Sequence, residues 1–451
     1  MFGLFSLIVP ALGLLAVSPV RAANTADIVS GAAWTDTDGN VIQGHGAGIL
    51  KVDSTYYWFG EDKTANSALF HAVSCYTSPD LTTWTRQPDA LSPVAGTNIS
   101  SNNIVERPKV IFNSKNDEYV MWFHSDSSNY GYAMVGVATA STPCGPYTYK
   151  SSWKPLGADS RDMGLFQDDD GTAYLLYASD NNVDFKVGLL DDDYYNITSV
   201  ASEIAGASLE APGVVKRDGV YYLFGSHTSG WAPNPNKFFT SSSLTGTWST
   251  EADIAPESTR TWYSQNAYDL PLGTNAIYMG DRWRSNLLGS SRYIWYPLDW
   301  SSGSPEVIHA DVWTVNLDAG TWTVVNGTSY EAEDGTLGGS AVLSSSSAFS
   351  GGQTVGFLGN GGTVTITVQG AGTSQWVALY YSNGDSTYRN TTVSVNGGAT
   401  TLVDQPDSGG GSVVISVPVL LNLNEGSNTI TFGANQSNYA GDLDKIIVYD
   451  S

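Results

Sequence analysis

The sequence predicts an all-β chain in two parts, a five-bladed β-propeller followed by a β-sandwich of the jelly-roll type. Aromatic residues make up 12% of the 451 residues and Gly occurs 48 times, which is typical of many short strands joined by tight turns. A strand rich in aromatic and branched residues recurs five times before residue 325, at steps of 48 to 63 residues. All-β sequence that repeats at about 50 residues indicates a propeller, in which each repeat forms one four-stranded blade.

Each repeat supplies one marker strand of the predicted blade. The five marker strands occupy residues 56–61, 119–124, 173–178, 220–225 and 276–281. Turn sequences such as Asp169-Asp170-Gly171 and Arg217-Asp218-Gly219 indicate hairpins within the blades. The alternative is a large β-sandwich or barrel in which this spacing is accidental.

The second part, residues 330–451, is predicted to form one β-sandwich. Val364, Ile366 and Val368 alternate with threonines, and Gly-rich turns separate this strand from later ones. All but one of the 14 Trp and all five His lie before residue 325, so the composition changes there. We therefore place the propeller at residues 23–325, a linker at 326–329 and the sandwich at 330–451.

The N-terminus has the pattern of a secretory signal. Residues 4–17 are apolar, too short for the roughly 20 residues that span a bilayer, and Val20-Arg21-Ala22 offers a cleavage site. We expect a signal peptide at 1–22 and a secreted, extracellular glycoprotein. Five Asn-x-Ser/Thr sequons support this expectation, at Asn98, Asn196, Asn326, Asn390 and Asn435. The two cysteines, Cys75 and Cys144, allow a single disulfide bond, which the spacing alone does not establish.

The net charge of −24 restricts the partners. Phosphate groups of nucleic acids and anionic membranes require a basic face, so neither is an expected partner. We expect a monomer that acts on a neutral, polar substrate.

Polar residues precede the marker strands at matched distances. Glu106, Asp162, Glu210 and Gln265 lie 12 to 14 residues before their markers, and His45 holds the corresponding place in the first repeat. In a propeller, the short apolar runs after these residues would be the innermost strands. We therefore expect the five side chains to converge on the axis.

Three carboxylates gathered at one point would repel one another, which raises at least one pKa and supplies a proton donor near neutral pH. Glycoside hydrolysis needs such a pair of groups, one protonated and one to handle water or to attack directly. The alternative is that these carboxylates are solvated turn residues. Four further side chains near the marker strands are candidate sugar contacts, or else ordinary packing residues: Glu61, Tyr130, Thr228 and Trp283. His45 is a candidate sugar contact as well, although a hydrogen-bonded core histidine is the commoner role.

Residues 30–325 resemble glycoside hydrolase family 43. The resemblance rests on Asp162-Met163-Gly164, Leu209-Glu210-Ala211-Pro212-Gly213, Glu106-Arg107-Pro108-Lys109-Val110 and the block at 78–84. It implies a five-bladed propeller that inverts the anomeric centre. It also implies that Glu210 is the general acid and that Asp162 orients it and adjusts its pKa.

The chain departs from the usual family pattern in the first blade. The family places its general-base aspartate there, whereas this sequence reads His45-Gly46-Ala47-Gly48. This departure resembles the exo-β-1,3-galactanase branch, which implies that Gln265 assists the water. Glu106, a true carboxylate, is the rival for that role.

The resemblance implies an enzyme that needs no cofactor for catalysis. Its substrate would be β-1,3-galactan, the backbone of arabinogalactan, from which galactose is released at the non-reducing end. The alternatives are an arabinanase, arabinofuranosidase or β-xylosidase on the same scaffold, or a non-catalytic glycan-binding propeller.

Residues 330–451 resemble carbohydrate-binding module family 35. The resemblance rests on Tyr330-Glu331-Ala332-Glu333, the block at 351–357 and Asp442-Leu443-Asp444-Lys445-Ile446. It implies a structural calcium held by Glu331, Glu333 and Asp444, whose hard oxygens suit this ion. The candidate sugar-binding residues of the module are Phe357, Asn396, Tyr439 and Asp442.

Overall fold

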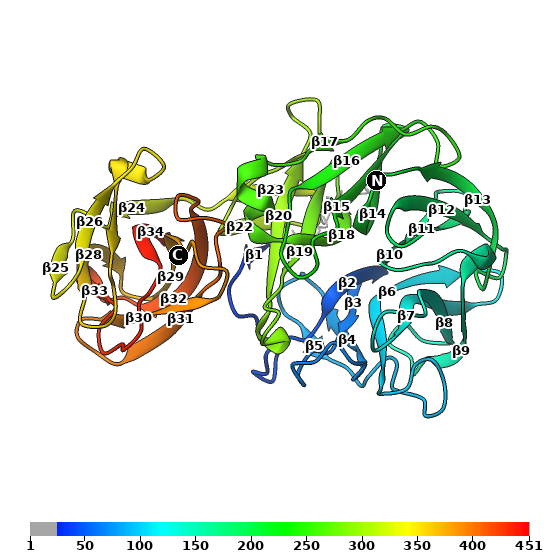
Figure 1. Ribbon diagram of the computed structural model, residues 1–451, viewed down its shortest axis with the longest axis horizontal. Coiled ribbons are helices and arrows are strands. Elements are labelled where there is room, and N and C mark those ends of the chain that lie inside the picture. Colours follow the sequence, from blue (N-terminus) through cyan, green and yellow to red (C-terminus); the bar gives the residue numbers. More distant parts are fainter. Residues whose placement is uncertain (1–24, 451) are drawn as a thin grey trace, which may run out of the picture.

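The computed structural model describes residues 25–450 (Figure 1). The prediction of an all-β chain is confirmed, since α1 (Arg260–Tyr263) is the only α-helix of this part of the chain. None of its helices is long and apolar enough to cross a membrane. The predicted signal peptide, 1–22, lies outside the described residues.

Five four-stranded antiparallel sheets follow one another along the chain. The first contains β2 (His45–Val52), β3 (Thr55–Glu61), β4 (Val73–Ser78) and β5 (Thr85–Arg86). The second contains β6 (Asn103–Asn113), β7 (Glu118–Ser127), β8 (Met134–Ala140) and β9 (Thr148–Trp153). The third contains β10 (Met163–Gln167), β11 (Ala173–Ser179), β12 (Asp184–Leu190) and β13 (Ile197–Ile204). The fourth contains β14 (Leu209–Arg217), β15 (Val220–His227), β16 (Asn236–Ser241) and β17 (Ala252–Asp253). The fifth contains β18 (Gln265–Leu272), β19 (Asn275–Arg282), β20 (Arg292–Asp299) and β21 (Glu306–Val307).

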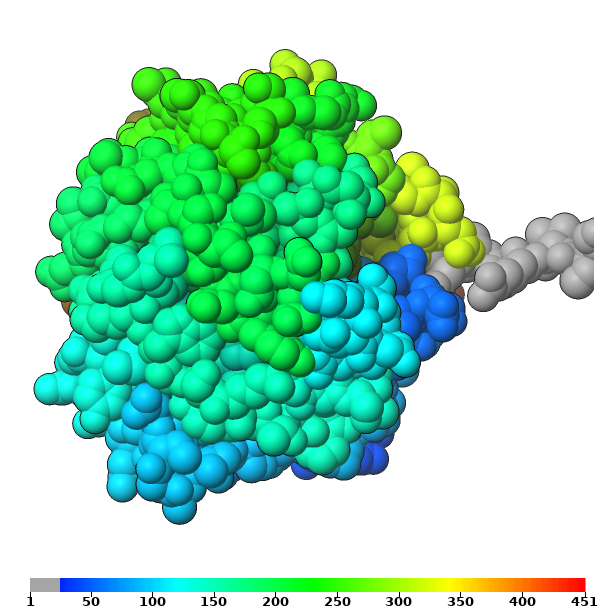
Figure 2. Space-filling view, turned by 90° about the vertical axis from the view of Figure 1, so that its right-hand side faces the viewer, coloured from blue at the N-terminus to red at the C-terminus, as the bar shows by residue number. Residues whose placement is uncertain are grey.

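The first strands of these sheets form a ring. In chain order β2, β6, β10, β14 and β18 each contact the next, and β18 contacts β2. The predicted marker strands are the second strands, so the polar residues before them lie in the innermost strands or, for Asp162, directly before one, as expected. This arrangement is consistent with a propeller of five blades. The face turned away from the C-terminal part is made largely of the second to fourth sheets, coloured from cyan to green in Figure 2.

A short three-stranded sheet joins the start of the described chain to the end of this region. It contains β1 (Thr25–Val29), β22 (Val312–Asn316) and β23 (Thr321–Val324), with β1 antiparallel to β22. Next to it, Trp58, Trp84, Trp295 and Trp313 are almost fully buried in one core cluster. Burial of these large aromatic surfaces stabilises the packing between the first and fifth sheets.

The question of the two cysteines is settled by the fold. Cys75 and Cys144 are disulfide-bonded. The bond links β4 of the first sheet to the segment between β8 and β9 of the second. It therefore ties two neighbouring sheets together.

The C-terminal part contains two antiparallel sheets that share one apolar core. The six-stranded sheet contains β24 (Gly327–Glu331), β26 (Val342–Ser345), β27 (Gln353–Gly356), β29 (Ser374–Ser382), β32 (Ile415–Asn422) and β34 (Asp442–Tyr449). The five-stranded sheet contains β25 (Thr336–Gly338), β28 (Thr363–Ala371), β30 (Arg389–Val395), β31 (Thr400–Gln405) and β33 (Glu425–Phe432). Val364, Ile366 and Val368 of β28 are buried against Leu379 and Ile446 of the other sheet. Two sheets that share a core in this way are consistent with a sandwich.

The linker prediction at 326–329 needs correction. Gly327–Glu331 forms β24, which pairs with β34 along its whole length. The backbone groups of this segment are used in a sheet ladder, so the segment is part of the C-terminal fold rather than a free connection. Only residues 325 and 326 separate β23 from β24.

Candidate active site

One pocket of about 270 Å³ lies at the ring of first strands and is lined by residues of all five sheets or of the loops beside them. It brings together the four predicted catalytic residues, Glu106, Asp162, Glu210 and Gln265. The complete lining is Glu61, Glu106, Arg107, His124, Tyr130, Arg161, Asp162, Asn182, Glu210, Gly230, Trp231, Gln265 and Trp283. Residues that lie far apart in the chain therefore meet at one point.

Irregular backbone directs these side chains toward the pocket. The ladders between first and second strands shift register directly after Glu106 and Glu210, and again after Asn266, next to Gln265. The residues after the two glutamates, Arg107 and Ala211, have φ of 52° and 56°. A β-bulge re-aims the side chain beside it, which is why bulges are common next to active sites.

Glu210 has the properties of a proton donor. Burial raises its pKa to about 8, and the negative charge of Asp162 acts in the same direction, while Arg107 opposes both. Asn182 Nδ2 lies 3.3 Å from its Oε1. A carboxyl group with this pKa is mostly protonated at neutral pH, as general acid catalysis requires.

Asp162 lies between the side chain of Arg107 and the backbone of Ala211, the residue after Glu210. Its Oδ2 is 2.6 Å from Arg107 Nε and accepts a hydrogen bond from the amide of Ala211 at 3.1 Å. Arg107 is buried, with 6% of its side chain exposed. This pair fixes Asp162 beside the strand that carries Glu210, where its charge favours the protonated form of that glutamate.

Glu106 is held in its ionised form. Its Oε1 accepts a hydrogen bond from Tyr130 Oη at 2.7 Å, and its Oε2 lies 3.2 Å from His124 Nδ1. Burial opposes ionisation, but these bonds and the charges of His124 and Lys63 outweigh it and lower the pKa of Glu106 to about 2. Glu106 and Glu210 therefore differ in protonation although they line one pocket.

Gln265 has a defined orientation. Its Oε1 lies 2.8 Å from Arg107 Nη2 and 3.0 Å from Trp283 Nε1. Guanidinium and indole nitrogens only donate, so the atom facing them must be the amide oxygen. The amide nitrogen then faces Ser226 Oγ at 3.2 Å and Glu210 Oε2 at 3.5 Å.

A metal ion does not suit this pocket. Glu106, His124 and Asp162 place candidate ligand atoms within 4.8 Å of one another. However, both ring nitrogens of His124 already lie against carboxylates, Glu106 and Asp126. Burial opposes protonation of His124, but these carboxylates raise its pKa to about 9, and a protonated imidazole cannot bind a metal. We assign the cluster to hydrogen bonding.

The family model of glycosyl hydrolases family 43 matches residues 41–270. The chain belongs to this family. The prediction of a glycoside hydrolase is thereby confirmed, and the match includes Glu106, Asp162, Glu210 and Gln265.

Solved structures of this family extend the likeness over nearly the whole chain. A variant of the exo-β-1,3-galactanase from Phanerochaete chrysosporium, in complex with β-1,3-galactotriose, is 73% identical with a TM-score of 0.92, over 94% of this chain and 100% of that one. An exo-β-1,3-galactanase from Clostridium thermocellum is 27% identical with a TM-score of 0.63, over 94% and 100% of the two chains. A curated β-D-galactofuranosidase from Aspergillus niger is 31% identical over 212 residues, 43% of this chain, and this chain spans 59% of its length.

Three of the five predicted sugar contacts line the pocket of this family 43 chain, and two do not. Glu61, Tyr130 and Trp283 are part of the lining. His45 is buried outside it, with Nδ1 2.9 Å from Asp281 Oδ1, so its role is the hydrogen-bonded core histidine. Thr228 is exposed and outside the lining as well, because its loop turns Gly230 and Trp231 toward the pocket instead.

Sequence reasoning missed Arg107, His124, Arg161, Asn182 and Trp231 as pocket residues. Arg107 directly follows Glu106, but an alternating strand would direct neighbouring side chains to opposite faces. The β-bulge after Glu106 interrupts this alternation, and the sequence gives no clear sign of the bulge. His124 closes a marker strand and was identifiable only as a strand residue.

A second pocket, of about 280 Å³, lies in the C-terminal part. It is lined by Phe357, Ser382, Asn383, Gly384, Arg389, Gly411, Tyr439 and Asp442. Three of the four predicted module residues are among them, and the rings of Phe357 and Tyr439 meet edge to face at 5.7 Å. Asn396 lies outside this pocket, and its side chain binds strand β33. Its Nδ2 donates to Asn428 Oδ1, and its Oδ1 accepts from the backbone amide of Thr429, both at 2.8 Å.

The three predicted calcium ligands lie around Ser350. Its Oγ donates to Glu331 Oε1 and its amide donates to Asp444 Oδ1, both at 2.8 Å. Glu331 Oε2 and Glu333 Oε2 are buried and have no hydrogen-bond partner in the described chain. Burial raises the pKa of Asp444 to about 6, and both glutamates add to the effect. Orphaned buried carboxylate oxygens fit a bound hard cation.

Proposed function

We propose that the protein is a secreted, inverting exo-β-1,3-galactanase that releases galactose from the non-reducing end of β-1,3-galactan, the arabinogalactan backbone. The observation that carries the proposal is that a protonated Glu210 and an ionised Glu106 line one pocket, together with Asp162 and Gln265. The 73% identity to an exo-β-1,3-galactanase that holds β-1,3-galactotriose supports the substrate. A pocket of about 270 Å³ lies just below the roughly 300–1,000 Å³ of ordinary ligand sites and suits a terminal sugar.

Glu210 would donate its proton to the glycosidic oxygen as the bond to the leaving sugar breaks. Water would attack the anomeric carbon from the opposite face, which inverts the configuration, and would lose one proton to Glu106 or to the solvent. Asp162 would keep Glu210 protonated and oriented. These steps involve side chains and water alone.

Two residues compete to hold the water. Gln265 has no useful proton affinity as an amide, and Arg107 and Trp283 already contact its oxygen. Glu106 is ionised, but its low pKa makes it a weak base. We retain Gln265 as the residue that positions the water and Glu106 as its rival. A crystal structure of Glu210→Gln with β-1,3-galactobiose would show which of them contacts the water beside the anomeric carbon.

The proposal is tested by incubating the protein with β-1,3-galactan, β-1,6-galactan, arabinan and xylan. We expect galactose from the first polymer only, and proton NMR of the earliest product should show the α-anomer. Release of arabinose or xylose would favour the alternative specificities. If no sugar is released from any polymer, the protein is a glycan-binding propeller.

The C-terminal part is proposed to be a carbohydrate-binding module of family 35 with its sugar site in the second pocket. Phe357 and Tyr439 are 55% and 40% exposed there, beside the polar Arg389 and Asp442. We expect Tyr439→Ala to weaken retention on insoluble β-1,3-galactan by about tenfold while hydrolysis of galactobiose is unchanged. Val342→Ala, on an exposed strand position outside this pocket, is the matched control. Equal retention of both variants would refute the site.

Calcium is proposed to bind Glu331, Glu333 and Asp444, where it would neutralise carboxylates that otherwise repel one another. Removal with EDTA should lower the melting temperature by about 5 °C, and added calcium should restore it. Glu331→Gln/Glu333→Gln should abolish this response. A melting curve of the wild-type protein that does not change with EDTA or calcium would contradict the proposal.

Secretion is proposed from residues 1–22 and glycosylation from the five sequons, and the protein is proposed to be a monomer. Sequencing the N-terminus of the protein collected from culture medium tests the first proposal. We expect the mature chain to begin near Ala23. Light scattering before and after deglycosylation tests the other two.

A further inference from the structure

Three consecutive residues beside the catalytic pocket are held by the C-terminal part. Arg282 Nη1 donates to the carbonyl of Ser416 at 3.1 Å. Tyr388 Oη donates to the carbonyl of Trp283 at 3.2 Å, and Arg284 Nη1 donates to Asp404 Oδ2 at 2.8 Å.

The middle residue of the three belongs to the catalytic pocket. Trp283 is 6% exposed, and its Nε1 donates to Gln265 Oε1 at 3.0 Å. Its ring also meets that of Trp231, another pocket residue, edge to face at 5.1 Å. A shift of the Trp283 backbone would therefore move the donor that orients Gln265.

Several further side-chain contacts join the two parts. The buried Asp311, next to β22, accepts hydrogen bonds from Tyr380 Oη at 2.6 Å and Tyr449 Oη at 2.8 Å, both from the C-terminal part. Arg284 also stacks on the Tyr388 ring, with its guanidinium carbon 4.7 Å from the ring centre. Buried bonds of this kind fix one relative orientation of the two parts.

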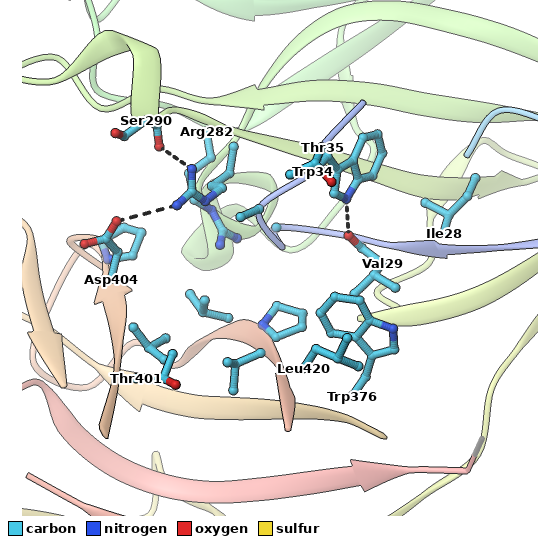
Figure 3. A pocket seen from close by; sticks show the side chains of 18 of the residues that line it. Ile28, Val29, Trp34, Thr35, Arg282, Ser290, Trp376, Thr401, Asp404 and Leu420 are labelled. Atoms are coloured by element: carbon cyan, nitrogen blue, oxygen red, sulfur yellow. Dashed lines mark hydrogen bonds and ion pairs between the residues drawn. The ribbon is translucent and has the colours of Figure 1, made fainter. Parts of the chain in front are cut away.

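Figure 3 shows part of the interface between the propeller region and the C-terminal part. A pocket of about 550 Å³ lies between the two parts, with Trp34 on the propeller side and Trp376 on the other. Asp404, on β31, lies on the C-terminal side of this pocket. Its Oδ2 lies 2.8 Å from Arg284 Nη1 and 3.7 Å from Arg292 Nη2. The C-terminal part thus binds the arginines at this end of the fifth sheet.

We propose that the C-terminal part supports the catalytic pocket from outside its lining, and that Tyr388 is a positioning residue that acts through Trp283 on Gln265. The proposal rests on the proposed galactan hydrolysis, because it concerns the residue that handles the water. It gives the C-terminal part a second role in addition to sugar binding. This second role does not involve the pocket of Phe357 and Tyr439.

The test compares two tyrosines whose hydroxyls donate across the interface, Tyr388 to a backbone carbonyl and Tyr380 to a carboxylate. Tyr388→Phe removes the hydroxyl that holds Trp283, whereas Tyr380→Phe removes one that holds Asp311, which is not among the pocket residues. With β-1,3-galactobiose as substrate, we expect Tyr388→Phe to lower kcat by about 2- to 10-fold, the value of one neutral hydrogen bond, with KM nearly unchanged. Tyr380→Phe should lower the melting temperature and leave kcat unchanged.

A double-mutant cycle shows whether the effect passes through Trp283. Trp283→Phe removes the indole donor to Gln265, so adding Tyr388→Phe to it should cause no further loss of kcat. The proposal is overturned if Tyr388→Phe has the wild-type kcat, if Tyr380→Phe lowers kcat equally, or if the two losses are additive. Failure of the wild-type protein to release galactose would instead refute the proposed function, before any variant is compared.

Discussion

Replacing Glu210 by Gln is expected to reduce galactose release from β-1,3-galactan by about 10²- to 10⁴-fold, the usual contribution of a general acid. Gln has nearly the same shape as a neutral carboxyl group, but it has no acidic proton to transfer. Initial rates with β-1,3-galactobiose measure the effect. Glu203→Gln is the matched control, because Glu203 is an exposed residue of the outer strand β13.

The pH dependence of the reaction gives a second measure of the role of Glu210. Since burial raises its pKa to about 8, the side chain carries its proton below that pH and loses it above. A general acid is active only when protonated, so kcat/KM of the wild-type protein should fall as the pH rises through about 8. Glu210→Gln should lack this alkaline limb. Wild-type activity in the variant would show that another group donates the proton.

Replacing Arg107 by Met is expected to destabilise the fold and to reduce activity together. Arg107 is buried, and its guanidinium contacts Asp162, Gln265 and the carbonyl of Asn266. Its loss leaves Asp162 without its charged partner, and it leaves Trp283 as the remaining side-chain donor to the oxygen of Gln265. Breaking a buried ion pair on one side costs about 3–5 kcal/mol.

Urea unfolding measures the stability change, and the pH profile measures the change at the site. Because the charge of Arg107 lowers the pKa of Glu210, the alkaline limb of any residual activity should move to higher pH. Lys154→Met removes one side of a more exposed pair, with Asp159 at 2.6 Å, and should change the free energy of unfolding by less than about 1 kcal/mol. Equal effects of the two substitutions would show that burial of Arg107 contributes nothing.

The arrangement of carboxylates in the pocket followed from spacing along the chain. The polar residues precede recurring strands at nearly constant distances, and a ring of first strands brings constant positions to one place. That is why Glu106, Asp162, Glu210 and Gln265 were identified before any coordinates. Phe357, Tyr439 and Asp442 were identified through resemblance, and they also share a pocket.

The failures have a different origin. His45 holds the matched position in the first repeat, yet Asp281 of the fifth sheet binds its ring and keeps it in the core. Thr228 and Asn396 belong to turns and loops whose direction is set by neighbouring segments. The predicted linker at 326–329 looked like a turn, but β34, more than 100 residues later, pairs with it.

The sequence by itself determined the all-β class, the five repeats and the residue types at the ring, because strand patterns and repeat lengths are local properties of a chain. Only the tertiary structure decided the protonation states, since the pKa of Glu210 rises and that of Glu106 falls according to which charges and donors surround each carboxyl group. It also decided that Tyr388 reaches Trp283, because contacts between residues 105 positions apart depend on how the two parts pack.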